Sequence, residues 1–482
     1  MVFNSQTFFL FFTLFFVVYW FICNRNLKLQ NGLLLIGSYV FYAWSDWRFL
    51  FFLIGVSLLN FFLGIYIEKS TSEKTKKILL YIGLTQGIGG LAFFKYYNFF
   101  ITSFKDAFAT VNISLNVSTL NIIIPLGISF FTFRTISYLL DIDKGKIKAT
   151  QDWIVFFNYL SFFPSLLSGP IDKAKMFIPQ LERNRIFEHN QAIDGMRQIL
   201  WGLFKKVVVA NNCAIITTEI FKNYQDLPAS SLLIGAFLYT IQIYADFSGY
   251  SDMAIGFSRL LGFSITKNFD FPFFSQNIAE YWRKWHISLT AWLTEYVFTP
   301  LSIAFRDYGN NGLVAAIVIN FTIIGIWHGA NWTYVLFGFL HGCYFIPLIL
   351  KGTMNKKKKI AKDKFFPTFV EIFNVLKTFT LVMLTFIIFK ANNITEAFDF
   401  YRHLFSATLF KMPKVDFSVV LISFFFTIVM LVVEWMNRET EHGLVVNKIK
   451  SVYVRWIIYF AIIVSMLFFG IFTDNQFIYF KF

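Results

Sequence analysis

The chain has 482 residues, of which 56% are hydrophobic, 21% are aromatic and only 15% are charged. An ordinary soluble domain carries about 25% charged residues, so this composition excludes that class and indicates a polytopic membrane protein. The net charge of +15 is spread over loops between apolar runs. That distribution favours the bias of Lys and Arg toward cytoplasmic loops over binding of nucleic acid or anionic lipid.

Apolar runs follow one another along the whole chain, and many are long enough to cross a bilayer as a helix. Their uninterrupted pattern favours helices over a transmembrane β-barrel. We expect about 11 or more full crossings, together with some re-entrant or interfacial segments. The runs cover residues 8–23, 31–45, 48–67, 78–100, 122–140, 153–169, 195–220, 231–245, 253–265, 293–304, 312–327, 332–350, 366–389, 417–434 and 456–473.

Charge orients the N-terminal end of the chain. Residues 1–7 carry no Lys or Arg, and the apolar run 8–23 is followed by Arg25 and Lys28. A cleavable signal peptide has its positive charges first and a small-residue cleavage site afterwards. The observed order predicts a retained helix with its N-terminus outside.

Charge also orients the C-terminal end. The loop 351–364 holds seven Lys and one Asp, so we expect it in the cytoplasm. Three apolar runs follow this loop, and the tail after them should therefore face the exterior. We expect a single transmembrane domain over residues 1–482 that ends in a short extracytoplasmic aromatic tail, residues 474–482.

The segment 162–181 is apolar but is interrupted by Pro164, Gly169 and Pro170. Lysines precede and follow it, so both of its flanks are expected in the cytoplasm. A segment that enters and leaves on one side is re-entrant, and such backbone is tolerated only where protein or a water-filled cavity satisfies it. The sequence therefore predicts a cavity within the helical bundle.

His286 lies in the dense aromatic segment 281–293. Treated as one helix, this segment places His286 on an apolar face that points inward. That face also holds Trp282, Trp285, Leu289 and Leu293, whereas Lys284, Ser288 and Glu295 fall on the opposite side. Alone, such a histidine would be interpreted as a packed core residue with a hydrogen-bonded ring.

A second histidine, His328, strengthens the functional interpretation. It follows the uncharged run 312–327 and is flanked by Trp327, Gly329 and Asn331. An ionisable side chain at membrane depth is a candidate functional group. Two inward histidines supply a general base and a partner that positions or polarises the substrate. The chain contains no G-x-S-x-G, H-E-x-x-H or Walker-type motif, so direct transfer of an activated acyl group to a hydroxyl is the chemistry that fits.

Two carboxylates stand out in the stretch 244–263. Asp246 and Asp252 lie among aromatic and small residues. They either cap the ends of a broken helix or line the site. The other histidines carry weaker signals: His341 either faces the same cavity or packs, and His189, His403 and His442 are expected to be solvated in charged loops.

Several long motifs resemble the membrane-bound O-acyltransferase family, and within it the bacterial alginate O-acetyltransferase-like branch. The resemblance covers nearly the whole chain. Its motifs are PLGISFFTFRTISYLLDI (125–142), SLLSGPI (165–171), YADFSGYSDMAIG (244–256), NFDFPFFSQNIAEYWRKWHISLTAWLTEYVFTPL (268–301) and GIWHGANWTYVLFGFLHG (325–342).

The resemblance implies an all-α polytopic fold, a ring of transmembrane helices around a central funnel or tunnel with re-entrant segments. It implies that His328, in the WHG segment, is catalytic and that His286, in the W-R-x-W-H/N segment, is the second critical position. The tail FIYFKF resembles an aromatic tail that would carry the acyl group transiently, here on Tyr479; a tyrosine anchored at the lipid headgroups is the alternative. The residues expected to line or support the tunnel are Trp282, Arg283, Trp285, Trp327, Asn331, Asp246 and Asp252.

The family also implies the direction of transfer in the bacterial cytoplasmic membrane. A cytoplasmic thioester donor, acetyl-CoA or another acyl thioester, would supply the acyl group, and no cofactor or metal would be permanently bound. An extracytoplasmic acyltransferase or a cell-surface polysaccharide would receive it. D-alanyl transfer to teichoic acids is an alternative within the class, and a transporter or flippase of a lipid-linked sugar is the alternative from another class.

Overall fold

We describe a computed structural model of the chain for all residues except 116, 357, 448, 473–476 and 478–482. The described residues form helices and loops, with no β-strand among them, which confirms the predicted all-α polytopic membrane protein. Among the described residues, nine helical stretches are long and apolar enough to cross a membrane. This number is smaller than the number of crossings that the sequence predicted. The apolar helix Gln6–Ile22 is shorter than these stretches. The nine stretches are Arg48–Lys69, Glu73–Ala109, His189–Lys222, Ala229–Leu260, Arg306–His328, Trp332–Leu350, Phe369–Lys390, Phe417–Met436 and Val452–Phe469.

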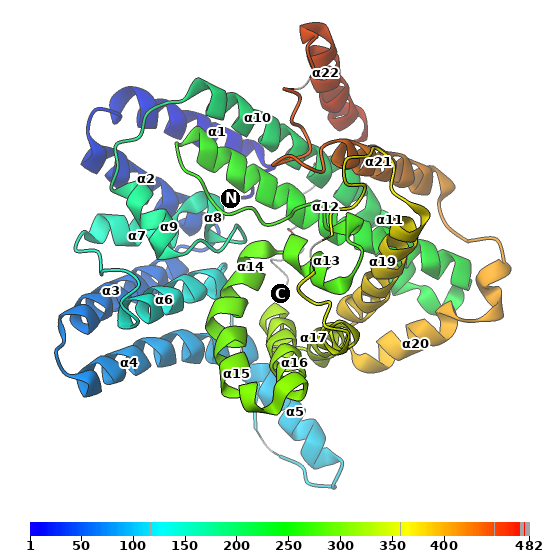
Figure 1. The fold of residues 1–482 in the computed structure, drawn as a ribbon, viewed down its shortest axis with the longest axis horizontal. Helices are drawn as coiled ribbons and strands as arrows, with labels where there is room; N and C mark the ends of the chain where they lie inside the picture. Colours follow the sequence, from blue (N-terminus) through cyan, green and yellow to red (C-terminus); the bar gives the residue numbers. More distant parts are fainter. Residues whose placement is uncertain (116, 357, 448, 473–476, 478–482) are drawn as a thin grey trace. The chain divides into compact units, whose positions relative to one another are not determined.

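The chain divides into two compact units, which we describe separately (Figure 1). Unit 1 comprises Met1–Gly195 and Ala254–Thr266, and unit 2 comprises Met196–Met253 and Lys267–Phe482. Two helices, α10 (His189–Phe204) and α12 (Ala229–Leu260), contribute residues to both units.

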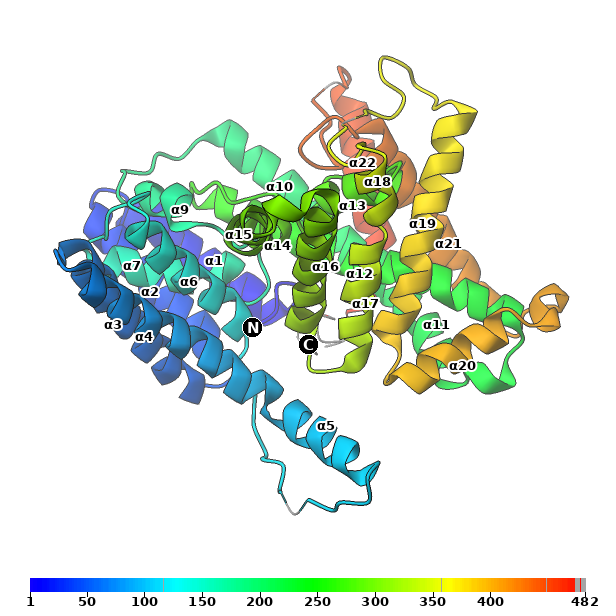
Figure 2. The same cartoon turned by 60° about the horizontal axis from the view of Figure 1, so that its bottom comes forward.

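Short polar side chains cap the first turns of α1, α2, α4 and α7 in unit 1. Asn26 accepts hydrogen bonds from the second and third residues of α2, and Asp152 does the same for α7, which satisfies backbone donors that have no partner within the helix. Helices α3, α4 and α6 run side by side (Figure 2). The helices are α1 (Gln6–Val17), α2 (Leu27–Ala43), α3 (Arg48–Lys69), α4 (Glu73–Leu91), α5 (Tyr97–Ala109), α6 (Ile128–Asp143), α7 (Trp153–Ser161), α8 (Phe163–Leu166) and α9 (Ala174–Leu181).

The interrupted segment 162–181 forms two short helices, α8 and α9, joined by buried loop residues. The guanidinium of Arg134, on α6, holds this loop by donating to the backbone carbonyls of Tyr159, Ser165 and Pro170 at 3.1–3.4 Å. Tyr159 and Ser165 lie near the C-terminal ends of α7 and α8, and Pro170 lies in the loop. Backbone carbonyls at these positions have no partner within a helix. The predicted break in the segment is confirmed, and its re-entrance into the membrane stays a prediction.

Most of α12, the longest helix among the described residues, belongs to unit 2. The sequence divided the apolar runs 231–245 and 253–265, but α12 continues without a break between them and ends at Leu260, so that division was wrong. Gly249 is tolerated within this helix because α10 approaches closely: a Cβ at Gly249 would lie 2.7 Å from the carbonyl oxygen of Gly202. Small residues at such crossings let helix backbones approach one another in membrane proteins.

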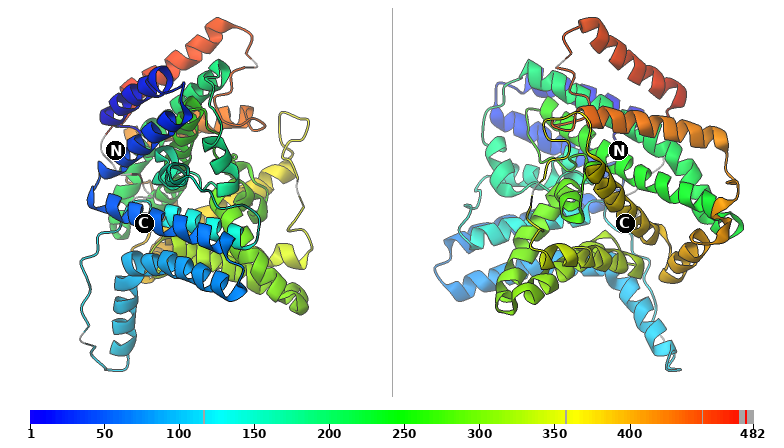
Figure 3. Two further views of the ribbon diagram at one scale, coloured as in Figure 1. Left: turned by 90° about the vertical axis from the view of Figure 1, so that its left-hand side faces the viewer. Right: turned by 45° about the vertical axis from the view of Figure 1, so that its right-hand side comes forward.

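The remaining helices of unit 2 differ in how closely they pack. Helices α16 and α17 pack closely along their length (Figure 2), whereas α22 extends away from them and buries only Met466 (Figure 3). The helices are α11 (Asn211–Lys222), α13 (Ile278–Lys284), α14 (Ile287–Leu293), α15 (Thr299–Ala304), α16 (Gly309–His328), α17 (Trp332–Cys343), α18 (Ile346–Leu350), α19 (Phe369–Lys390), α20 (Ile394–Leu404), α21 (Phe417–Met436) and α22 (Val452–Phe469).

Candidate active site

His286 lies at a break between two short helices, not within one helix as the sequence analysis expected. Helix α13 ends at Lys284, α14 begins at Ile287, and His286 between them has φ 45° and ψ 52°. This left-handed backbone conformation is uncommon for any residue other than glycine. The helical wheel therefore misplaced the neighbouring residue Ser288, which is buried rather than on an outer face.

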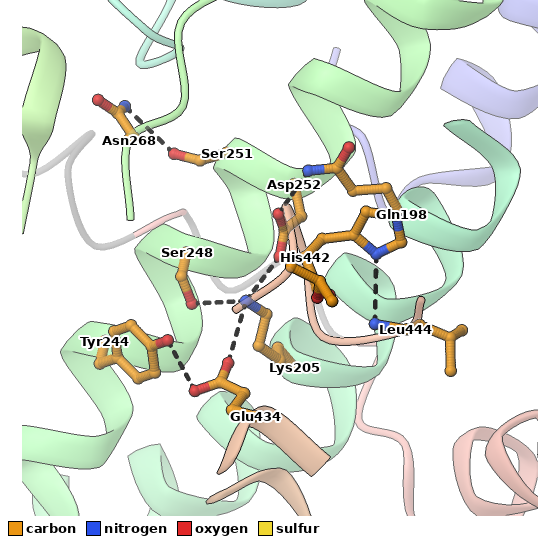
Figure 4. A network of polar contacts seen from close by, with 11 residues as sticks. Gln198, Lys205, Tyr244, Ser248, Ser251, Asp252, Asn268, Glu434, His442 and Leu444 are labelled. Atoms are coloured by element: carbon orange, nitrogen blue, oxygen red, sulfur yellow. Dashed lines mark hydrogen bonds and ion pairs between the residues drawn. The ribbon is translucent and has the colours of Figure 1, made fainter. Parts of the chain in front are cut away.

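Asn268 holds this break in place. Its backbone carbonyl accepts from the amide of Ile287 at 2.9 Å, and its side-chain oxygen accepts from the hydroxyl of Ser288 at 2.6 Å. Its side-chain nitrogen donates to Ser251, on α12, at 3.3 Å (Figure 4). Asn268 thus connects the backbone after His286 to α12. The sequence analysis missed this residue, because its partners are distant in the sequence.

The ring of His286 is fully buried among aromatic side chains. Its centroid lies 4.7 Å from that of Phe247, edge to face, and 5.5 Å from that of Trp327. Burial lowers the pKa of His286 to about 3, because the charged imidazolium loses its hydration. The imidazole is therefore neutral at physiological pH, with one N–H donor and one nitrogen acceptor.

His328 is the last residue of α16 and is also buried. Its ring centroid lies 5.0 Å from that of Trp327 and 5.1 Å from that of Phe389. The next residue has to be small, since a Cβ at Gly329 would lie 2.4 Å from the ring of Tyr334. The indole of Trp327 contacts both imidazoles, so His286 and His328 belong to one aromatic cluster.

This arrangement can support proton transfer in an environment that excludes water. Two imidazoles within an aromatic shell provide an acceptor for a hydroxyl proton and a donor for a developing oxyanion. Because the shell is apolar, the hydrogen bonds that these rings make to a substrate are stronger than in water.

The residues expected to support the tunnel have diverse surroundings. Trp282 donates from its indole nitrogen to Nδ1 of His341 at 3.1 Å, and Nε2 of His341 lies 3.2 Å from the hydroxyl of Thr385. Trp285 stacks with Tyr281, with ring centroids 5.4 Å apart. His341 is thus a hydrogen-bonded partner of the motif that contains His286.

Asn331 and Arg283 occupy other positions. Asn331 caps the N-terminus of α17 by accepting from the amide of Thr333 at 3.0 Å. Arg283 donates to the backbone carbonyl of Met354 at 3.2 Å and lines a cavity of about 590 Å³. Neither His286 nor His328 lines this cavity or a neighbouring one of about 510 Å³. The single tunnel that would join the two histidines stays a prediction.

The other histidines follow the sequence analysis in part. His189 is exposed and His403 is half-buried. His442 was expected to be solvated but is buried, and its Nδ1 accepts from the amide of Leu444 at 3.2 Å (Figure 4). A short loop folded over a polar cluster explains this burial, which charge content alone does not reveal.

Asp246 and Asp252 lie within α12, so the helix-cap interpretation was wrong. Asp246 pairs with Lys206 at 2.5 Å, and Asp252 pairs with Lys205 at 2.7 Å. Lys205 also donates to Ser248 at 2.9 Å and lies 3.7 Å from Glu434 (Figure 4). These ionic groups are mostly buried, and such groups are stable only when paired.

Three further residues of these ionic contacts, Lys205, Lys206 and Glu434, were not singled out from the sequence. A signal for them exists, because charged residues inside apolar runs are rare and functional by default. Lys205 and Lys206 begin a π-helical turn, Lys205–Ala210. Such turns are frequent at functional sites. Glu434 accepts from the hydroxyl of Tyr244 at 2.8 Å.

The C-terminal tail contributes one described residue. Phe477 is buried, stacks on Tyr250 with ring centroids 4.6 Å apart and lies 5.8 Å from Phe247. Phe247 in turn contacts His286. Tyr479 lies outside the described residues, so its expected role as an acyl carrier stays a prediction.

Comparisons with known proteins agree with the resemblance. Residues 149–389 match the profile of MBOAT, the membrane-bound O-acyltransferase family. The chain is 34% identical over 425 residues to the "Probable alginate O-acetylase AlgI" of Pseudomonas aeruginosa, covering 86% of this chain and 77% of that protein.

Two other relatives bear different names. The "Peptidoglycan O-acetyltransferase" of Helicobacter pylori is 31% identical over 395 residues, which is 76% of this chain and 71% of that protein. The "Teichoic acid D-alanyltransferase" of Streptococcus thermophilus is 31% identical over 286 residues, which is 55% of this chain and 68% of that protein. With nine candidate spans among its described residues, this chain is a multi-pass membrane enzyme that transfers acyl groups and belongs to the membrane-bound O-acyltransferase family.

Proposed function

We propose that this enzyme moves an acetyl group from a cytoplasmic thioester, acetyl-CoA, across the bacterial cytoplasmic membrane for O-acetylation of a cell-surface polysaccharide. The acceptor is the polysaccharide or a partner acyltransferase outside the membrane. The relatives named for O-acetylation match along three quarters or more of this chain. The relative named for D-alanyl transfer matches over 55% of it, so acetyl is the better-supported acyl group.

The observation that carries the mechanism is the pair of buried histidines whose rings both contact Trp327. His328 accepts the proton of the acceptor hydroxyl, whose oxygen attacks the thioester carbonyl. The neutral ring of His286 donates a hydrogen bond to the oxygen that becomes negative. As the C–O bond forms and the C–S bond breaks, His328 returns the proton to the departing thiolate.

Tyr479 is proposed as a transient carrier of the acetyl group. A phenol has a pKa of about 10, so its ester is more reactive than an alkyl ester and passes the acyl group onward. The packing of Phe477 against Phe247, which contacts His286, supports a tail that reaches this region. Tyr479→Phe removes only the hydroxyl. Loss of polymer acetylation supports the carrier, and parental acetylation makes the tail an anchor.

The central test is His328→Gln, which keeps a polar side chain of similar size but removes the base. Loss of a general base lowers the rate about 100- to 10,000-fold. Radiolabelled acetyl incorporated into the surface polymer measures the rate, and membrane abundance of the protein checks insertion. The control is His403→Gln on α20, far along the chain from the histidine pair. Parental acetylation by His328→Gln would refute the assignment.

A donor competition separates acetyl from D-alanyl transfer. Membranes that contain the enzyme receive either acetyl-CoA or a D-alanyl thioester of a carrier protein. We expect the acetyl group to disappear from the thioester in a manner that depends on His328. Consumption of only the D-alanyl thioester would replace the proposed substrate while leaving the role of His328 intact.

A further inference from the structure

A second cavity of unit 2, beside the Lys-rich loop, has an unusual charge. Its volume is about 510 Å³, and its described lining includes three lysines but no carboxylate. The adjacent cavity of about 590 Å³ shares Lys358 but also holds three carboxylates. One of those, Glu280, is already paired with Lys284 at 2.8 Å. The second cavity therefore carries an excess of positive charge that a bound anion would neutralise.

The walls of this cavity combine charge with apolar surface. Lys356 and Lys358 come from the loop, and Lys377 comes from α19. The apolar part of the lining includes Tyr344, Pro347, Leu348 and Leu381. These walls belong to α17, α18 and α19, which include two of the candidate membrane spans. The cavity thus extends from the loop after the span Trp332–Leu350 to residues within α19, and basic pockets between spanning helices bind lipid headgroups.

Exposed apolar residues next to the cavity lining in the sequence of α19 favour a lipid over a soluble anion. On α19, Phe373 and Leu376 flank Asn374 and Lys377, and their side chains are 68% and 59% exposed. A soluble phosphate would contact the lysines alone and make no use of this apolar surface. A phospholipid would place its phosphate among the lysines and its acyl chains along the exposed face of α19.

We propose that this cavity binds the headgroup of an anionic phospholipid. Lysine recognises a phosphate oxygen as a point charge, and basic pockets between spanning helices on the cytoplasmic side bind such headgroups. The bound lipid also holds the loop: it offsets the mutual repulsion of its lysines and keeps the carbonyl of Met354 in reach of Arg283. The site is independent of the acetyl donor and acceptor.

Cys343 lines the cavity and reports its occupancy. We would use full-length protein with Cys23→Ser in detergent, in which the remaining Cys213 is fully buried. Phosphatidylglycerol should slow alkylation of Cys343 by N-ethylmaleimide several-fold and raise the melting temperature, since a ligand of the folded state stabilises it. Phosphatidylcholine, glycerol 3-phosphate and coenzyme A should not protect Cys343.

Two triple variants complete the test. Lys356→Gln, Lys358→Gln and Lys377→Gln together should abolish protection by phosphatidylglycerol. The control variant carries the same Lys→Gln change at Lys69, Lys74 and Lys77, three exposed lysines of unit 1. Phosphatidylglycerol should still protect Cys343 in this variant. Unprotected Cys343 in the parent, or protection that survives the cavity variant, would overturn the proposal. Protection by coenzyme A alone would also overturn it and assign the cavity to a nucleotide.

Discussion

His286 combines two features that are costly separately: a left-handed backbone and a fully buried ring. Left-handed backbone in a non-glycine residue costs about 1–3 kcal/mol and persists only where the surroundings impose it. Here the hydrogen bonds of Asn268 to the two following residues supply that constraint. A strained residue of this kind is a candidate for function on physical grounds.

The low pKa of His286 makes stability depend on pH. The pKa of histidine in the unfolded chain is about 6.5, whereas burial lowers the pKa of His286 in the folded protein to about 3. Between these values the unfolded chain binds more protons, so the free energy of unfolding falls as the pH falls through this window. We predict that His286→Asn, which tolerates left-handed backbone and stays neutral, reduces the loss of melting temperature between about pH 7 and pH 5.

Melting of purified protein in one detergent at both pH values measures this effect. His189→Asn is the control, because it changes an exposed histidine and should melt as the parent does. A variant His286→Asn whose melting temperature declines as steeply as that of the parent would show that this ring is not buried in neutral form.

The pair of Lys206 and Asp246 allows a direct test of the buried ionic contacts. Both side chains are almost fully buried, and their charged atoms are 2.5 Å apart. Removal of one partner of such a pair leaves an uncompensated charge and costs about 3–5 kcal/mol. We predict that Lys206→Met destabilises the protein by this amount, and that Lys206→Met with Asp246→Leu is much less destabilised.

Denaturant or thermal unfolding in detergent gives the four corners of this double-mutant cycle. Equal destabilisation by the single and the double variant would show that the two charges are not coupled. Coupling without loss of acetyl transfer in the double variant would restrict the pair to a structural role.

Helix α16 carries His328 at its end, and its position depends on contact with α17. A Cβ at Gly325 would lie 2.1 Å from the carbonyl oxygen of Tyr334, and one at Gly338 would lie 2.2 Å from that of Phe321. Backbone atoms cannot move aside as a flexible side chain can. The two glycines thus set the separation of the helices and, with it, the place of the imidazole.

We predict that Gly325→Ala lowers stability by about 1–3 kcal/mol, as expected for overpacking, and lowers acetyl transfer because His328 shifts. The control is Gly90→Ala on α4, where nothing lies within 4 Å of the added Cβ. That change should be neutral or stabilise by up to about 1 kcal/mol, since alanine favours a helix over glycine. A tolerated Gly325→Ala would contradict the close packing of α16 on α17.

Whole-molecule topology depends on the charge of the loops. If the Lys-rich loop 351–364 is cytoplasmic, α19 crosses outward, and the connection between α19 and α21 lies outside. We predict that a membrane-impermeant maleimide labels Lys411→Cys in intact cells, but labels Asn355→Cys only after permeabilisation. Both positions are exposed, and Cys23 and Cys343 would first be replaced by Ser. The opposite labelling pattern would invert the orientation of the chain.

The sequence alone determined the class of the molecule. Hydrophobic content adds up locally along the chain, so runs such as 417–434 predicted membrane helices that the structure contains. Long motifs likewise predicted the family, which the comparisons confirmed. The positions of His286 and His328 in apolar segments pointed to candidate catalytic residues before any geometry was known.

Only the tertiary structure decided how these residues are held. Periodicity assumes a continuous helix, and it could not foresee the break at His286, which depends on hydrogen bonds to Asn268, 20 residues earlier than Ser288. It could not assign Asp246 and Asp252 to ion pairs either, because their lysines lie on another helical segment. The apolar pattern of a helix depends on residues that are close in sequence, whereas the partner of a buried polar group depends on which distant segments the fold brings together.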